Sequence, residues 1–283
     1  MKILSFDIEE WFHILDHPLT KDPGSWRNFE SRIFRNMDII FELLDKHQQP
    51  ATFFCIGWIA ERYPEVIRRI AKYNYDIACH SYMHQLVYEL SPAAFKEDTY
   101  KAIDILRQVS GQKINAYRAP GFSIMDSNLW AFEILQELGI EVDSSVFPAQ
   151  RAHGGLPDFT SATPSVIHYK GGALKEFPLN THSFAGVKWV FSGGGYFRAF
   201  PYGVIKRWTK ESDYMMTYFH PRDFDKEQPV LPDLSLLRRF KCYYGLDTTY
   251  LKLDKLLDSF KFTDIRSAVD LIDWPSTAQI KLG

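Results

Sequence analysis

Two short segments carry side chains that could hold a divalent metal ion: Asp7-Ile8-Glu9-Glu10 and His80-Ser81-Tyr82-Met83-His84. Side chains alternate along a strand, so Asp7 and Glu9 are expected to share one face. An H-x-x-x-H spacing places two imidazoles on one face of a helical turn, as in zinc sites with histidines at i and i+4. Two histidines and one carboxylate leave positions for water, as a catalytic zinc site requires. Each segment alone also fits an acidic turn or a pair of unrelated surface histidines.

Three further residues have side chains suited to acid–base chemistry. Arg118 is followed by a rigid Pro120-Gly121 turn and could hold a carboxylate in a bidentate pose. His220 comes late in the chain, within Tyr218-Phe219-His220-Pro221, and could act as a general acid near neutral pH. Asp143, which opens an Asp-Ser-Ser segment, could orient that imidazole and keep it protonated. Each of these residues, taken singly, also fits a structural role.

Apolar patterns predict the elements that position these residues. Strands are expected at residues 2–6, 51–56, 75–79, 116–118, 141–143 and 214–219. Helices are expected at 32–47, 60–73, 129–138 and 92–109, the last capped by Ser91. This alternation favours a parallel α/β sheet or barrel, in which active sites gather at the C-terminal ends of the strands. The residues at predicted strand ends are Asp7, His80, Arg118, Asp143 and His220.

The second half of the chain has a different character. Glycine pairs punctuate residues 149–200, which predicts hairpins and loops, and residues 234–260 are expected to be mostly helical. The segment 151–200 is expected to face the substrate. Its rings could form a stacking wall over a sugar, although an ordinary packed hairpin explains them equally well: Trp189, Phe191, Tyr196 and Phe197. No repeat or linker is visible, so we expect one domain over 1–283, with core motifs at 7–221 and a C-terminal extension at about 222–283.

Composition narrows the class of partner. The 283 residues carry a net charge of −2, which argues against a general nucleic-acid binder. No apolar run reaches the roughly 18 residues of a membrane span, and the N-terminus lacks the pattern of a signal peptide. The three cysteines show no short spacing, which fits a reducing compartment. We therefore expect a cytoplasmic protein, with room for peripheral contact with a membrane surface, and the oligomeric state stays open.

The order of the motifs resembles the polysaccharide deacetylase family, also called the NodB-homology family or carbohydrate esterase family four. D-x-E, H-x-x-x-H, R-x-P, D-S-S and Y-F-H-P follow one another across residues 7–221. The resemblance implies removal of acetyl groups from sugars, on a distorted (β/α) barrel with a bound divalent metal. The segment Gly194-Gly195-Tyr196-Phe197-Arg198 and the tail at 244–257 resemble a subgroup with an extra C-terminal segment, associated with bacterial exopolysaccharide and surface-polysaccharide assembly.

The resemblance also implies a role for each catalytic candidate. Asp7 matches the catalytic base, and Arg118 matches the arginine that pairs with this base. His220 matches the catalytic acid, which would protonate the leaving amine, and Asp143 matches the aspartate that tunes that acid. The turn Pro120-Gly121-Phe122 would offer backbone donors to the oxyanion, and this turn and Tyr196 are the expected substrate-binding residues.

The metal ligands are implied in the same way. His80 and His84 match two ligands of the family's metal. Many members have two adjacent aspartates where this chain has Asp7-Ile8-Glu9-Glu10, so the third ligand is Glu9 or Glu10. Strand alternation favours Glu9, which falls beside Asp7. Such a metal would acidify a bound water and polarise the acetyl carbonyl. Zinc is the expected ion, and imidazole and carboxylate ligands also accept nickel or cobalt.

The expected substrate is an N-acetylated sugar, which would be an oligosaccharide, a polymer or a lipid-linked precursor. Two other functions stay open. A related metal-dependent hydrolase could open another amide, such as a small ring amide, within a closed pocket. A catalytically silent module could bind a glycan or a protein partner, and loss of a ligand would be its signature. The departure at Glu9 and Glu10 keeps this last reading open.

Overall fold

The computed structural model describes residues 1–15, 17–149 and 154–283. They form two compact units, each built from two stretches of chain. Unit 1 consists of Met1–Ala51 and Thr181–Asp264, and unit 2 of Thr52–Asn180 and Ile265–Gly283. The last stretch of the expected C-terminal extension therefore belongs to unit 2. That the whole chain acts as one domain stays a prediction.

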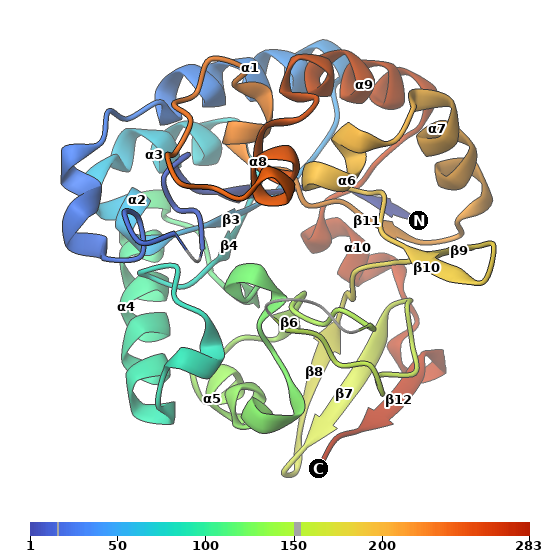
Figure 1. The fold of residues 1–283 in the computed structure, drawn as a ribbon. Helices are drawn as coiled ribbons and strands as arrows, with labels where there is room; N and C mark the ends of the chain where they lie inside the picture. The colour runs from blue at the N-terminus through green and yellow to red at the C-terminus, as the bar shows by residue number, and fades with distance from the viewer. Residues whose placement is uncertain (16, 150–153) are drawn as a thin grey trace. The chain divides into compact units, whose positions relative to one another are not determined.

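Unit 2 contains a mostly parallel sheet (Figure 1). Neighbouring strands are parallel except for the β7–β8 hairpin. The strands expected at 51–56, 75–79, 116–118 and 141–143 are confirmed, with slightly shorter bounds. In spatial order the strands are β12 (Ala278–Lys281), β7 (Ser165–Tyr169), β8 (Gly172–Glu176), β6 (Val142–Asp143), β5 (Ala116–Tyr117), β4 (Asp76–Cys79) and β3 (Thr52–Cys55).

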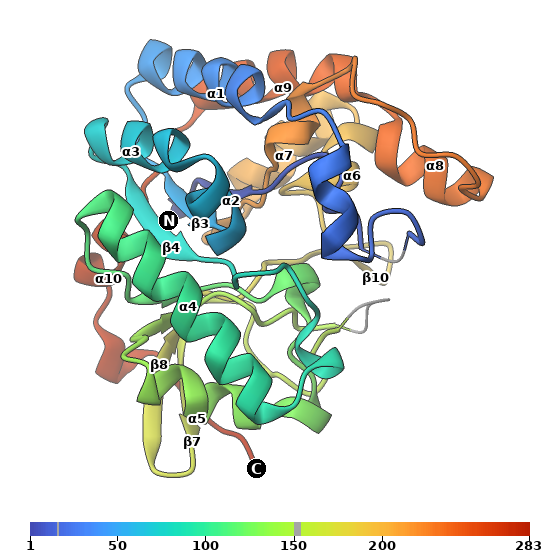
Figure 2. The same cartoon turned by 90° about the vertical axis from the view of Figure 1, so that its left-hand side faces the viewer.

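The helices of unit 2 are α2 (Gly57–Arg62), α3 (Pro64–Lys72), α4 (Pro92–Ser110), α5 (Trp130–Glu137) and α10 (Ile265–Leu271). α4 packs on α2, α3 and α5 (Figure 2). As expected, Ser91 caps α4: its Oγ accepts the backbone N–H of Ala94 at 3.2 Å. The single helix expected at 60–73 is wrong. Pro64 cannot continue a helix, so the chain turns at Tyr63 and starts again as α3.

The strands of unit 1 are short. β1 (Lys2–Ile3) pairs in parallel with β11 (Met215–Met216), and Phe6 of β2 (Ser5–Ile8) bridges Phe219. The strand expected at 2–6 is thus divided, and the one expected at 214–219 is regular over two residues only. β9 (His182–Phe184) and β10 (Val187–Trp189) form an antiparallel hairpin.

Helices make up most of the rest of unit 1. They are α1 (Ile33–His47), α6 (Gly194–Ala199), α7 (Tyr202–Glu211), α8 (Leu236–Tyr243) and α9 (Leu246–Ser259). The hairpins expected within 149–200 are present as β7–β8 and β9–β10, but α6 was not expected, and residues 150–153 lie outside the described residues. Short 3-10 helices span Pro23–Asn28, Val87–Glu89, Pro120–Phe122, Asp126–Asn128, Pro221–Phe224 and Trp274–Ser276.

Two structural observations relate to the expected cellular location of the chain. Among the described residues, no helix has both the length and the apolar character needed to cross a bilayer. Cys55, Cys79 and Cys242 are free thiols, as their spacing predicts. The cytoplasmic location stays a prediction.

Candidate active site

The strand ends of unit 2 form one continuous row. Paired positions on β4, β5, β6 and β8 are occupied by Cys79, Tyr117, Asp143 and Glu176. The pairing continues one residue further, because the N–H of Arg118 donates to the carbonyl of Cys79 at 3.0 Å and that of Ser144 to Tyr117 at 2.9 Å. These strands are parallel, so the residues that follow them lie at the same end of the sheet. The predicted strand-end positions of His80, Arg118 and Asp143 are confirmed.

His80 and His84 lie together in unit 2. Both are buried, and their ring centroids are 5.3 Å apart. Nδ1 of His80 lies 2.8 Å from the carbonyl oxygen of Arg118. A carbonyl only accepts, so this Nδ1 carries the proton and Nε2 is the atom suited to bind a metal. The pair therefore has the chemistry of a metal site, with one ring already fixed in orientation.

The segment that carries the two histidines is not helical, so the predicted helical turn is wrong. Ser81 and His84 both have left-handed backbone angles, with φ of 66° and 52°. Ser81 Oγ accepts the N–H of His84 at 3.0 Å. Asp98 of α4 accepts the N–H groups of Tyr82 and Met83 at 2.7 and 3.0 Å. Burial raises the pKa of Asp98, although these bonds favour its ionised form. Asp98 holds this loop in place and was not among the predicted site residues.

Arg118 is fully buried at the end of β5. Its guanidinium carbon lies 3.9 Å from the centroid of the Phe54 ring. Nη2 donates to Ser144 Oγ at 3.1 Å, and Nε donates to the carbonyl of Ser144 at 3.3 Å. These contacts place a permanent positive charge at the strand ends of unit 2, where a mobile surface arginine was the alternative.

The turn after Arg118 offers less for an oxyanion than the sequence suggested. Pro120 has no N–H, and the N–H of Phe122 already donates to the carbonyl of Ala119 at 3.0 Å. Gly121 has φ of 62° and bends the chain there. Within this turn the oxyanion role, which stays a prediction, falls to Gly121.

Asp143 faces a second acid that was not among the predicted site residues. Glu176 occupies the paired position on β8, and both side chains are fully buried. Asp143 accepts from the hydroxyl and the N–H of Ser145 at 2.7 and 2.9 Å, and Glu176 accepts the N–H of Val146 at 3.2 Å. Burial raises the pKa of both carboxyls, and the charge of Asp143 raises that of Glu176 further. The pair therefore favours binding a proton, and the pKa of Glu176 is the one raised more strongly.

In unit 1, two carboxylates face one imidazole. Nε2 of His220 lies 3.8 Å from Asp7 Oδ2 and 3.7 Å from Glu9 Oε1. The N–H of Asp7 donates to the carbonyl of Phe219 at 2.7 Å, which aligns the end of β2 with the approach to His220. Because both acids point at the same ring, the prediction that Asp7 and Glu9 share a face is confirmed.

The other nitrogen of His220 is held by Asp223, which was not among the predicted site residues. Nδ1 lies 3.0 Å from Asp223 Oδ2, and Asp223 Oδ1 is paired with the buried guanidinium of Arg198. Burial alone would lower the pKa of His220, but the charges of Glu9, Asp223 and Asp7 outweigh it and raise this pKa to about 9. The imidazole is therefore protonated at neutral pH, which is the form a general acid needs. That Asp143 tunes His220 stays a prediction.

Glu10 has a structural task. Its carboxylate accepts the N–H groups of Arg32 and Ile33 at 3.0 and 3.1 Å and the hydroxyl of Ser31. These donors belong to the start of α1, so Glu10 caps that helix. Burial raises the pKa of Glu10 despite these bonds. Between the two candidate ligands, Glu9 is the one that lies beside Asp7 and His220.

The expected aromatic wall is only partly available to a ligand. Phe191 and Phe197 are fully buried, with ring centroids 5.5 Å from Trp208 and 4.9 Å from Phe219, so the prediction is wrong for these two. Tyr196 is 40% exposed, and its role in substrate binding stays a prediction.

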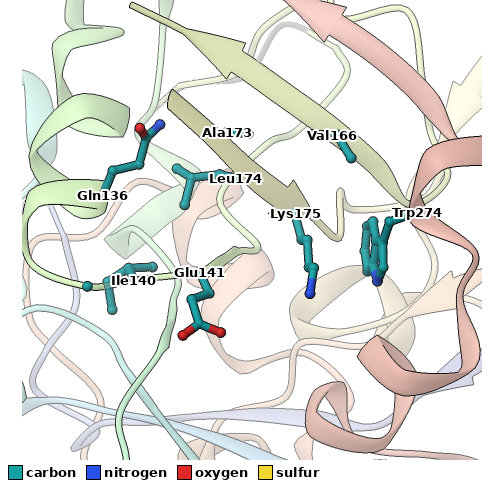
Figure 3. A pocket seen from close by; sticks show the side chains of 9 residues that line it. Gln136, Ile140, Glu141, Val166, Ala173, Leu174, Lys175 and Trp274 are labelled. Atoms are coloured by element: carbon teal, nitrogen blue, oxygen red, sulfur yellow. The ribbon is translucent and has the colours of Figure 1, made fainter. Parts of the chain in front are cut away.

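A cavity of about 460 Å³ in unit 2 lies away from these groups (Figure 3). Ile140, Glu141, Lys175 and Trp274 line part of it, and Figure 3 shows Lys175 beside Trp274, with the ammonium 5.5 Å from the ring centroid. Glu141 precedes β6, whereas Asp143 ends it. The cavity therefore opens at the N-terminal end of β6, opposite the strand ends where catalytic residues gather in such folds.

Comparison with known proteins relates two segments of the chain to known families. Residues 22–142 match the polysaccharide deacetylase family, and residues 144–270 match a domain of unknown function, DUF3473. The chain is 30% identical over 95 residues to a peptidoglycan-N-acetylglucosamine deacetylase of Bacillus cereus, covering 33% of this chain and 34% of that protein. It is 26% identical over 128 residues to a chitooligosaccharide deacetylase of Bradyrhizobium, covering 45% and 58%. The match thus spans less than two thirds of either relative.

Solved structures with the same fold cover almost the whole chain. A candidate polysaccharide deacetylase from Mycobacterium smegmatis aligns with a TM-score of 0.67 at 18% identity, covering 100% of this chain and 93% of that one. A pseudoenzyme of carbohydrate esterase family four from Bacillus anthracis aligns with a TM-score of 0.53 at 13% identity, covering 99% and 69%. The predicted α/β fold of the NodB-homology type is confirmed.

Proposed function

Because the chain belongs to the polysaccharide deacetylase family, we propose that it is a metal-dependent hydrolase that removes acetyl groups from N-acetylated sugars. The observation that carries this proposal is that Nε2 of His220 lies within 3.8 Å of both Asp7 and Glu9. An acid, a base and a candidate ligand thus meet in unit 1. The names of the peptidoglycan and chitooligosaccharide deacetylases support the class of substrate.

The residues present suit a divalent ion. We propose that His80, His84 and Glu9 hold this ion, as the resemblance implies, and that the ion is zinc. The hydrogen bond from His80 Nδ1 to Arg118 supports this, because metal-binding imidazoles normally anchor their second nitrogen in that way. When bound, the ion would supply positive charge that acidifies water and stabilises a developing oxyanion.

The chain's own residues would handle the protons. Asp7 would accept a proton from the attacking water. His220 would donate its Nε2 proton to the departing nitrogen, while Asp223 keeps the Nδ1 proton in place. Arg118 would pair with Asp7 and orient it, as the resemblance implies. The turn Pro120-Gly121-Phe122 and Tyr196 are proposed to contact the substrate.

Two broader proposals follow from the same assignment. The resemblance extends over most of the chain, so we take 1–283 as one catalytic domain of the polysaccharide deacetylase type. The resemblance of 194–198 and of the tail to the exopolysaccharide-associated subgroup supports a role in bacterial surface-polysaccharide assembly. The substrate would then be an oligosaccharide or a lipid-linked precursor.

Metal content and acetate release test the proposal together. Elemental mass spectrometry should find about one divalent ion per chain, and the His80→Ala/His84→Ala variant should lose it. The wild type should release acetate from N-acetylglucosamine oligomers. Asp7→Asn should keep the ion and lose about 10²- to 10⁴-fold in rate, the usual contribution of a general base.

Two results would contradict the proposal in different ways. If neither the wild type nor the His80→Ala/His84→Ala variant holds an ion after metal is supplied, the metal-dependent hydrolase is excluded. A catalytically silent binding module would then be the function to test. If Asp7→Asn keeps its metal and near-full turnover, the base is another residue.

A further inference from the structure

Helix α8 turns its apolar side chains to the solvent. Of the eight described residues of α8, none is buried. Leu236 is 87% exposed, Leu237 65% and Phe240 49%. A surface helix normally packs its apolar stripe against the core. Here the stripe faces outward, so core packing cannot account for these residue types.

Polar contacts hold the inner side of α8 against unit 1. The hydroxyl of Tyr243 accepts the N–H of Leu231 at 3.0 Å, and the guanidinium of Arg238 donates to the carbonyl of Leu15. Arg198 donates to the carbonyls of Lys241 and Cys242 at 2.7 and 3.2 Å. In Figure 2, α8 lies at the outer edge of unit 1, beyond α6. The helix is therefore anchored from behind and its apolar face stays outward.

Cations border this apolar face. At about 100° per residue, Leu236, Phe240 and Leu237 span an arc of about 100°. Arg239 and Lys241 fall on either side of the arc, and both are exposed. α8 contains no acidic residue. Arg and Lys side chains at such borders can lay their stems on an apolar layer and keep their charges among anionic headgroups.

An aromatic pair extends the face. The rings of Phe240 and Tyr244 are stacked, with centroids 4.5 Å apart and an interplanar angle of 26°. Tyr244 is also exposed, and its ring has the apolar body and polar tip that suit a bilayer interface. α8 has eight residues and is about 12 Å long, whereas each partner of a stable protein complex contributes about 20–30 residues to the interface. The size and the charge pattern favour a membrane surface over a protein.

We propose that α8 and Tyr244 form a contact surface for bilayers that contain anionic lipids. The apolar arc would enter the interface, and Arg239 and Lys241 would pair with lipid phosphates. This inference does not rest on the proposed hydrolase function, and its test needs no activity.

Flotation of the full chain with vesicles tests the proposal. The wild type should float with vesicles of phosphatidylcholine and phosphatidylglycerol, should float less at high salt, and should stay behind with phosphatidylcholine alone. Arg239→Glu/Lys241→Glu should weaken binding at least about twentyfold, since each cation near an anionic surface contributes about fivefold. Leu236→Ser/Leu237→Ser/Phe240→Ser should weaken it about tenfold or more.

Matched variants control for charge and hydrophobicity. Lys206→Glu/Lys210→Glu changes two exposed cations of α7 by the same amount, and Leu271→Ser removes a 71% exposed leucine from α10. Both should bind like the wild type. Hydrogen exchange on the wild type should slow over 236–244 when anionic vesicles are added. Absence of flotation, or equal losses in the control variants, would overturn the proposal. So would a dimer that the triple serine variant abolishes, because a second copy would then occupy the face.

Discussion

Nδ1 of His220 lies 3.0 Å from Oδ2 of Asp223, three residues further along the chain. Asp223 also accepts the backbone N–H of His220 at 2.9 Å, so one carboxylate fixes both the ring and the main chain that carries it. Burial raises the pKa of Asp223, but Arg198 and His220 outweigh this and leave the pKa below its usual value. The candidate acid thus has a carboxylate neighbour that ionises more readily than a free aspartate.

Replacing Asp223 should change the titration of His220. In metal-free protein, Asp223→Asn should lower the pKa of His220 below its value of about 9, because one of the charges that raise it is lost. The raised pKa also means that the charge on His220 stabilises the fold most fully below about pH 6.5 and loses this effect as pH rises through about 9. The variant should lose less stability over that window. NMR titration of the imidazole would measure the shift.

The control for this titration is Asp225→Asn. Asp225 ends the same turn and pairs with Arg32, without a described contact to His220. This variant should leave the titration of His220 near pH 9. An unchanged pKa in Asp223→Asn would show that Glu9 and Asp7 alone set it.

Replacing each of the two adjacent glutamates by glutamine should separate the residue that binds the metal from the residue that stabilises the fold. Glu9→Gln should lose the metal and keep the thermal stability of the metal-free protein. Glu10→Gln should keep the metal and lower the free energy of unfolding by about 1–2 kcal/mol, because it weakens the cap of α1. Metal content and urea unfolding of both variants would check this. The reverse pattern would make Glu10 the ligand.

The buried acid pair should make stability depend on pH. The folded state raises the pKa of Glu176 well above its usual value, so the folded chain binds more protons than the unfolded chain above about pH 4.5. Stability should therefore fall as pH rises from there. Glu176→Gln keeps the shape of the side chain but cannot titrate. The difference in free energy of unfolding between this variant and the wild type should therefore favour the variant more at pH 8 than at pH 5.

Glu141→Gln provides the opposite case for comparison. Lys113 lowers the pKa of Glu141, so this exposed variant should lose a little stability above about pH 4.5. Urea unfolding at pH 5 and pH 8 would measure the free energy of unfolding of both variants. A Glu176→Gln protein that is less stable than the wild type at pH 8 would show that the charged form is needed.

Asp98 should affect metal binding from a distance. Asp98→Ala removes the acceptor for two N–H groups of the histidine loop, so metal affinity should fall about 10- to 100-fold, as for other supporting residues. Asp104→Ala, on the same helix, removes only a bond to Gln108 and should leave affinity unchanged. Competition with a coloured chelator would measure both. Equal affinity in the two variants would mean that the loop holds its shape without Asp98.

Local pattern was enough to place some of the site. A buried strand that ends in a polar residue predicts a strand-end side chain, and His80, Arg118 and Asp143 follow that rule. The alternation of Asp7 and Glu9 is equally local. The helical turn at His80–His84 failed because Asp98 holds a conformation that spacing does not encode.

The residues that were missed depend on distant partners. Glu176 sits in a hairpin where a lysine and a glutamate look like surface residues, and its burial depends on pairing with β6. Asp223 could be predicted from the sequence as a partner of His220, because it follows this histidine by three residues after a proline. Its charge partner Arg198 lies on another helix, so its role could not be inferred from the local segment.

Arg198 gives the candidate acid and the outer helix a common support. Its guanidinium is buried, and it holds Asp223 on one side and the last carbonyls of α8 on the other. A force that displaces α8 would remove acceptors from this guanidinium and change how it holds Asp223. Because Asp223 in turn holds Nδ1 of His220, displacing α8 would be expected to alter that hydrogen bond as well.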